Sequence, residues 1–238
     1  IGDEAAWIDR ALRINAQHPQ YARALLGHVA GASRNEEVRA RAQSQLIASL
    51  RDAKLASTAL RLFADPRRFP VAQLHPNVRF EVGALAADQK HPEEALRFWQ
   101  NLPQPPGMSA PEWRLGYVAA LLAAGMMDAG LEGAKSALAG PPALPPELIG
   151  RWNKIAADAL ERWQLIAAES LFAMVLPVAQ GPERINALLG LAKARELRGE
   201  FRAAADAYFN AAALYASPDA DREALRAREW GAVNLAKA

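Results

Sequence analysis

A pattern of small and aromatic residues recurs along this chain with a period of about 36 residues. Copies of the pattern start near residues 5, 40, 76, 111, 149 and 185. Its most regular features are an alanine and, four residues later, an aromatic residue: Ala59 and Phe63, Ala95 and Trp99, Ala168 and Phe172, Ala204 and Tyr208. A unit this short cannot bury its own apolar face, so the period predicts stacked neighbours that share a core.

The composition predicts that each unit is helical. The chain has 54 alanines, the residue with the best helix propensity, and a single threonine, Thr58. Within a copy, apolar residues recur three and four positions apart, as in Trp152, Ile155 and Ala159, which is the spacing of one buried helix face. We therefore expect an all-α chain.

The best copy resembles a tetratricopeptide repeat (TPR), in which two antiparallel helices meet through small residues. Gly199 and Phe201 are followed by Ala204 and Tyr208, and Ala192 would lie at the close crossing with Ala204. The resemblance implies one domain over residues 1–238: a right-handed α-α superhelix, or solenoid, of about six TPR-like hairpins and a C-terminal helix. A related α-solenoid or an irregular helical superhelix is the alternative fold.

Residues 219–238 are expected to form the C-terminal helix, starting at Ser217 or Asp219. This helix would be either a solvating cap or the first part of a seventh repeat. Because it carries the apolar residues Leu225, Trp230 and Val233, we expect the natural protein to continue beyond Ala238.

The sequence lacks the motifs of most enzymes and cofactor sites. It has no cysteine and no Gly-rich phosphate loop, and its four histidines have no metal-ligand spacing. The pairs Glu36–Glu37 and Glu93–Glu94 fall in predicted first turns of helices, where acidic residues favour the helix dipole. We expect no catalytic residue, no metal and no cofactor, although scattered residues could in principle assemble a site.

The charge balance and the apolar runs bear on partners. The 28 basic and 26 acidic residues leave a formal charge of +2 without a basic cluster, so nucleic acid is not an expected partner. The apolar run at residues 165–178 is too short for a bilayer and carries Glu169, so no transmembrane segment is expected.

If the resemblance holds, the first helix of each repeat lines a concave groove that binds another protein, as an extended peptide or a helix. Positions carried over from the family give the expected groove residues Asp9, Arg13, Arg41, Arg51, Asn77, Phe80, Asn153, Asn186 and Lys193. Asn is a mediocre helix residue, so the positions of Asn153 and Asn186 would be explained if their amides served a ligand backbone. The other interpretation, which we favour for any single residue, is a solvated polar face.

The sequence thus predicts a protein-binding scaffold or adaptor that is not an enzyme. The high Ala and Arg content suggests a bacterial source, and the absence of cysteine is compatible with a periplasmic protein. By association with bacterial TPR proteins we expect a role in envelope or exopolysaccharide assembly, with a cytoplasmic adaptor as the alternative. Most of the six tryptophans are expected in the core, Trp99 and Trp152 among them. A glycan-binding or glycan-processing superhelix, for which the half-exposed Trp163 beside Glu161 is the local hint, and an accessory domain of a larger enzyme are the other functional alternatives.

Overall fold

The computed structural model describes residues 3–105, 107–139, 144–215 and 221–238. This part of the chain is all-helical, with 78% helix and no strand. The prediction of an all-α chain is confirmed. Its physical basis is the abundance of alanine and the scarcity of β-branched residues that would favour strands.

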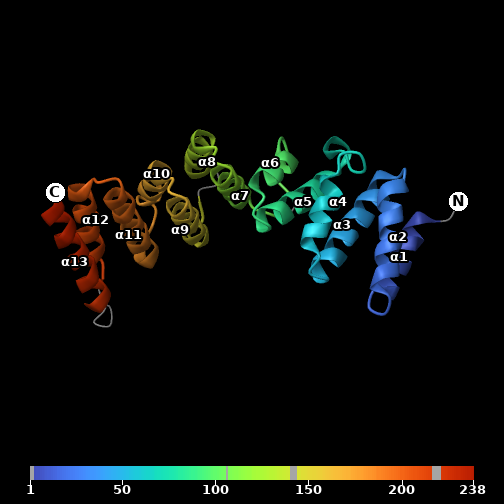
Figure 1. Ribbon diagram of the computed structural model, residues 1–238, viewed down its shortest axis with the longest axis horizontal. Helices are drawn as coiled ribbons and strands as arrows, with labels where there is room; N and C mark the ends of the chain where they lie inside the picture. Colours follow the sequence, from blue (N-terminus) through green and yellow to red (C-terminus); the bar gives the residue numbers. More distant parts are fainter. Residues whose placement is uncertain (1–2, 106, 140–143, 216–220) are drawn as a thin grey trace. The chain divides into compact units, whose positions relative to one another are not determined.

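The chain divides into two compact units, Ile1–Met108 and Ser109–Ala238, whose helices are labelled in Figure 1. The first unit contains α1 (Glu4–Ile14), α2 (Pro19–Ala32), α3 (Glu36–Asp52), α4 (Ala56–Ala64), a short 3₁₀ helix (Val71–Gln73), α5 (Pro76–Asp88) and α6 (Pro92–Trp99). The second unit contains α7 (Ala110–Ala123), α8 (Met127–Ala139), α9 (Pro146–Glu161), α10 (Leu165–Val175), α11 (Gly181–Leu197), α12 (Phe201–Ala213) and α13 (Asp221–Lys237).

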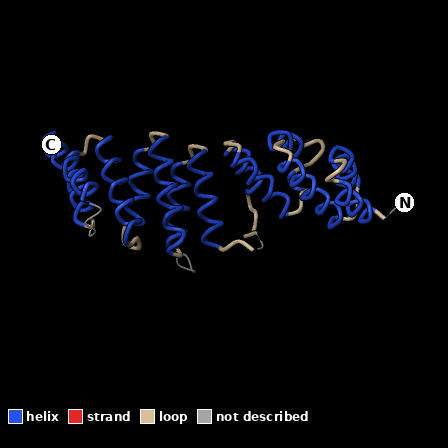
Figure 2. The backbone as a smooth tube through the Cα atoms, turned by 90° about the horizontal axis from the view of Figure 1, so that it is seen from below, coloured by secondary structure: helices blue, strands red, loops and turns tan. Residues whose placement is uncertain are grey.

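Within each unit, most helices that follow one another in the chain pack side by side (Figure 2). The odd-numbered helices are also neighbours: α3 contacts α1 and α5, and α9 contacts α7 and α11. Each unit is therefore built from helical hairpins whose first helices form a row.

The first helices of the hairpins begin close to the repeat starts that the sequence predicts. The first helix of each hairpin begins at Glu4, Glu36, Pro76, Ala110, Pro146 or Gly181. His18, His75 and His91 are the residues just before Pro19, Pro76 and Pro92 at the starts of α2, α5 and α6, as predicted. Proline is favoured there because its missing N–H would have no partner in the first turn.

The same turn joins the two helices of five hairpins. In each, one residue has a positive φ of 59–80°: Lys54 (59°), Lys90 (62°), Gly125 (77°), Trp163 (60°) and Gly199 (80°). Two backbone hydrogen bonds recur around it; at Lys90, for example, its N–H donates to the Ala87 carbonyl and the His91 N–H donates to the Ala86 carbonyl. This is the Schellman motif, which satisfies the last carbonyls of a helix. The turns repeat with the period found in the sequence.

The same positions are buried in each hairpin, at fixed numbers of residues after these turns. Five residues after each positive-φ residue, a small residue is buried: Ala59, Ala95, Gly130, Ala168 and Ala204. Four residues further on, another side chain is buried: Phe63, Trp99, Ala134, Phe172 and Tyr208. The predicted burial of these positions is confirmed. The small residue lets the second helix approach the first closely, and the next residue fills the space beside it.

Lys90 has the left-handed backbone conformation that glycine favours, so its replacement by glycine should stabilise the protein. A residue with a Cβ pays about 1–2 kcal/mol in the left-handed region, whereas glycine pays none but loses more backbone freedom on folding. We therefore expect Lys90→Gly to raise the free energy of unfolding, measured in urea, by about 0.5–1 kcal/mol. Gly199→Ala, the opposite change in an equivalent turn, should lower it by about 1 kcal/mol. If the two changes altered the free energy of unfolding in the same direction and by the same amount, the two turns would not share this backbone geometry.

The final helix differs slightly from its predicted range. The structure gives α13 as Asp221–Lys237, and the predicted start at Ser217 or Asp219 lies outside the described residues. One side of α13, with Ala224, Ala227 and Asn234, is buried against the unit, and α12 is its principal neighbour. Leu225, Trp230 and Val233 are exposed by 44–55%.

Candidate partner-binding site

Polar side chains connect the first helices of adjacent hairpins in the first unit. Arg41 on α3 forms an ion pair with Asp9 on α1, with 2.8 Å between Nη2 and Oδ1. On α5, burial raises the pKa of the Glu81 carboxyl, while a hydrogen bond with Ser44 and the charge of Arg51, both on α3, act in the opposite direction. The row of first helices therefore presents a polar surface whose charges interact across hairpins.

The remaining expected groove residues of the first unit are mostly available to solvent. Arg13, Arg51 and Asn77 are exposed or partly exposed, in the last turn of α1, the last turn of α3 and the first turn of α5. Phe80 is half-buried and stacks on Trp99, with ring centroids 6.3 Å apart. Its ring thus serves the packing of α5 on α6 and offers only part of its surface to a partner.

In the second unit, Asn186 and Lys193 lie exposed on α11. Lys193 is paired within its own helix, since its Nζ lies 3.0 Å from Glu196 Oε2. Lys193 is consequently already neutralised, and Asn186 is the more available of the two.

Asn153 is placed differently from the expectation. It is 7% exposed, and its Nδ2 donates to the backbone carbonyl of Glu183 at 2.9 Å and to Glu183 Oε2 at 2.8 Å. Both amide protons are therefore used to join α9 to α11. The backbone that this amide serves belongs to the protein itself. The sequence shows an Asn in a good helix but cannot show that its partner lies 30 residues later.

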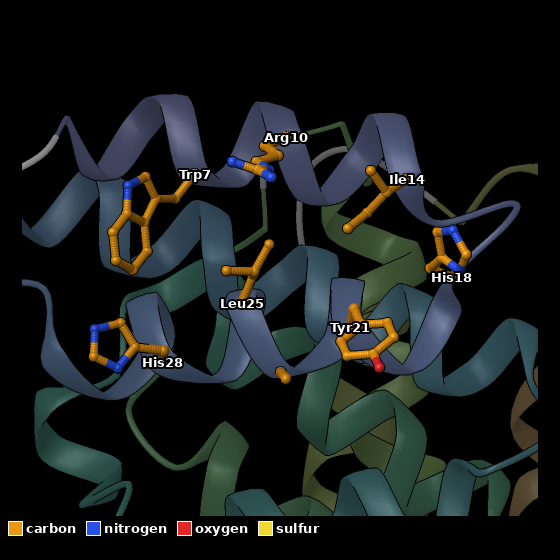
Figure 3. Close-up of a pocket in the computed structure, with 8 residues that line it drawn as sticks. Trp7, Arg10, Ile14, His18, Tyr21, Leu25 and His28 are labelled. Carbon is orange, nitrogen blue, oxygen red and sulfur yellow. The ribbon is translucent and has the colours of Figure 1, made fainter.

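The structure also contains a pocket that the sequence reasoning missed, between α1 and α2 (Figure 3). Its volume is about 690 Å³. Trp7, Arg10 and Ile14 line it from α1, and Tyr21, Ala24, Leu25 and His28 line it from α2, with His18 from the turn between them. The signal in the sequence is a second stripe on each helix, at positions 7, 10 and 14 and at 21, 25 and 28, beside the stripe that forms the core.

The chemistry of this pocket is apolar and cationic. The rings of Trp7 and His28 lie 5.5 Å apart, and those of His18 and Tyr21 lie 6.0 Å apart. No Asp or Glu is among its lining residues. The pocket therefore favours an apolar group that carries a negative charge.

The expectation that most tryptophans are in the core is wrong. Trp99 and Trp152 are buried, as predicted, and Trp163, predicted to be half-exposed, is 71% exposed. Trp7 and Trp230 are also exposed, by 41% and 44%. Trp163 occupies the positive-φ position of the α9–α10 turn, where an aromatic residue cannot reach the core. Glu161 is exposed as well, so this turn offers no cleft in which an aromatic face and a carboxylate converge on a glycan.

Glu196 joins three helices of the second unit. Its carboxylate accepts hydrogen bonds from Lys193 Nζ at 3.0 Å and from the hydroxyl of Tyr208 on α12 at 3.1 Å, and Lys237 Nζ on α13 lies 3.6 Å away. Burial acts to raise the pKa of Glu196, but these hydrogen bonds and positive charges outweigh it and lower the pKa below the ordinary value of 4.5. Burial and the Glu196 charge raise the pKa of the Tyr208 hydroxyl.

The lowered pKa of Glu196 predicts an acid-dependent loss of stability. A carboxyl whose pKa is lower in the folded state stabilises the protein above the unfolded pKa, near 4.5, and this contribution is lost as the pH falls through the folded value. Glu196→Gln should therefore destabilise the protein at pH 7 by about 1 kcal/mol and flatten the pH dependence of unfolding below pH 4.5. Urea unfolding at neutral pH and at a pH about one unit below 4.5 measures both. An unchanged pH dependence would contradict the role of this network.

No family model matches the chain, and no curated protein matches it. Among the described residues, no group of three or more His, Asp or Glu side chains is arranged to hold a metal ion. Nor does any described helix have the length and apolar character needed to cross a membrane.

Proposed function

We propose that this chain is a TPR-like scaffold without catalytic activity, whose first helices together bind a segment of another protein. In this proposal the hairpins continue as a right-handed solenoid. The first helices line its concave face. The scaffold contributes a surface that is already formed, so that little ordering cost falls on it when a partner binds.

The repeated turn is the observation that carries the proposal. Five hairpins end their first helix in the same Schellman motif and bury a small residue five positions later. A turn and a close crossing that recur in this way give successive hairpins the same internal geometry, which is the basis of a solenoid. The neighbouring first helices of each unit support a shared binding face.

The charges on this face favour an acidic partner for the first unit. Asp9 neutralises Arg41 at 2.8 Å, whereas Arg13 and Arg51 are cations on the same row of helices that solvent can reach. An extended segment that carries Asp or Glu at two positions would pair with both. Such contacts set specificity and association rate more than total affinity.

Selection from a random peptide library displayed on phage tests the proposal even though the partner is unidentified. We expect acidic peptides to be enriched, and to bind the double variant Arg13→Glu, Arg51→Glu at least about tenfold more weakly. Arg61→Glu, Arg67→Glu is the matched control, because it makes the same charge change on exposed residues of α4 and the loop after it. Asn153 is left intact in these variants because it holds α9 to α11.

Two outcomes would overturn the proposal. Enriched peptides that lose affinity equally for the groove variant and its control would show a general charge effect. Peptides that bind the groove variant as well as the original chain would place their site elsewhere.

The setting of this function is part of the same proposal. We place the protein in a bacterial periplasm, in envelope or exopolysaccharide assembly, with a cytoplasmic adaptor as the alternative. A role as an accessory domain of a larger enzyme is compatible with the same binding surface. The exposed Trp163 and Glu161 do not favour a glycan-binding superhelix.

A further inference from the structure

Two surfaces, formed by residues near opposite ends of the sequence, contain none of the expected groove residues. The first is the pocket between α1 and α2 (Figure 3). The α1 side of this pocket has Arg10 between two apolar residues, Trp7 and Ile14. The Arg10 side chain has no hydrogen bond or ion pair with the described residues, and no carboxylate lines the pocket. The pocket thus presents an unpaired cation on an apolar surface.

The second surface is the outer side of α13. The buried residues Ala224, Ala227 and Asn234 mark the side that faces the unit. Leu225, Glu229 and Val233, spaced four residues apart, lie on the opposite side of the helix. Leu225 and Val233 are 55% and 52% exposed, and Glu229 is exposed without an ion pair among the described residues. This stripe presents an anion between two apolar residues.

The two stripes match in order, charge and length. On α1 the order is apolar, cation, apolar, and on α13 it is apolar, anion, apolar. At a rise of about 1.5 Å per residue, Trp7 and Ile14 are about 10 Å apart along the helix, and Leu225 and Val233 are about 12 Å apart. The small residues Ala232 and Ala236 lie on the same side of α13 as Glu229, which leaves room for the bulky rings of the pocket.

We propose that the outer stripe of α13 in one copy of the chain docks in the α1–α2 pocket of a second copy, with Glu229 paired to Arg10. The contact is an amphipathic helix in a groove between two helices. Because the two surfaces differ, it is a head-to-tail contact, and an open assembly of any length still offers one free pocket at one end and one free α13 at the other. The protein would then assemble into chains of scaffolds, each with its own binding face.

Charge exchange tests this contact with the full chain. Sedimentation velocity over a range of concentrations should show association of the original protein, weakened by raised salt. Arg10→Glu and Glu229→Arg should each weaken association about tenfold or more. A mixture of these two variants should associate again, because the carboxylate introduced into the pocket of one variant then faces the guanidinium introduced on α13 of the other. The unchanged Arg10 and Glu229 pair in the reciprocal contact. The double variant within one chain should also associate.

The control is Arg61→Glu, which changes the charge by the same amount on the exposed side of α4 and should leave association unchanged. Circular dichroism identifies a variant that has lost helix, and the recovery in the mixture is a result that unfolding cannot give. A protein that stays monomeric at every concentration, or a mixture that fails to associate, would overturn the proposal. Self-association that survives both single variants would do so too. Peptide binding to the groove is a separate measurement, so the two proposals can fail independently.

Discussion

Trp152→Ala is expected to lower the free energy of unfolding of the second unit by about 3–5 kcal/mol. Trp152 on α9 is 1% exposed, and its side chain belongs to the core that also contains Leu171 and Phe172 of α10. Its indole Nε1 donates to the backbone carbonyl of Leu171 at 2.8 Å. The change would open a cavity in the core and remove the indole donor from that carbonyl, so both costs add.

Urea unfolding followed by circular dichroism measures this loss. Trp230→Ala is the matched control, because Trp230 is 44% exposed on α13 and its removal opens no cavity. We expect it to cost about 1 kcal/mol. Similar losses for the two variants would mean that Trp152 is not at the centre of the second unit.

Gly190→Ala is expected to cost about 2–3 kcal/mol, although alanine is normally the better helix residue. Gly190 on α11 lies against the ring of Phe172 on α10. An added Cβ would come within 2.6 Å of three ring atoms, closer than van der Waals contact allows. The two helices would have to separate, and the packing of the third hairpin of this unit on the second would be lost.

A double-mutant cycle identifies the cause of this loss. Phe172→Leu removes the ring edge that Gly190 accommodates, so Gly190→Ala should cost much less in its presence, with an interaction energy of about 1–2 kcal/mol. Gly116→Ala on α7 is the control, since the nearest atom to its added Cβ is 3.5 Å away at the end of the Arg151 side chain. That change should be neutral or stabilising by up to about 1 kcal/mol. If the double variant lost as much stability as the two single variants together, α10 and α11 would not cross closely at Gly190 and Phe172.

The repeated features of the fold were predictable because they depend on residues near one another in the sequence. Ala95 and Trp99 lie on one turn of a helix, and His91 precedes the proline that starts it, so spacing alone indicates the start and the buried face. The left-handed turn at Lys90 was harder to predict, because nothing about lysine favours a positive φ. There the geometry of the hairpin prevails over the preference of the residue.

The site was less predictable because it depends on contacts between distant residues. The ion pair of Asp9 with Arg41 and the bond of Asn153 to Glu183 join residues about 30 positions apart in the sequence. The resemblance put Asp9, Arg41 and Asn153 among the expected groove residues but could not show that their side chains already have partners. Similarly, Trp7 belongs to the second stripe of α1, and only the structure shows that this stripe lines an open pocket.

Small-angle X-ray scattering tests the central proposal, the continuous stacking of hairpins, most directly. The Arg10→Glu variant, extrapolated to zero concentration, should report single chains. A globule of 238 residues has a radius of gyration of about 18 Å. The proposed solenoid predicts a clearly larger value and a distance distribution with a long tail. A radius near that of the globule with a symmetric distribution would contradict it, and the shared groove would lose its basis.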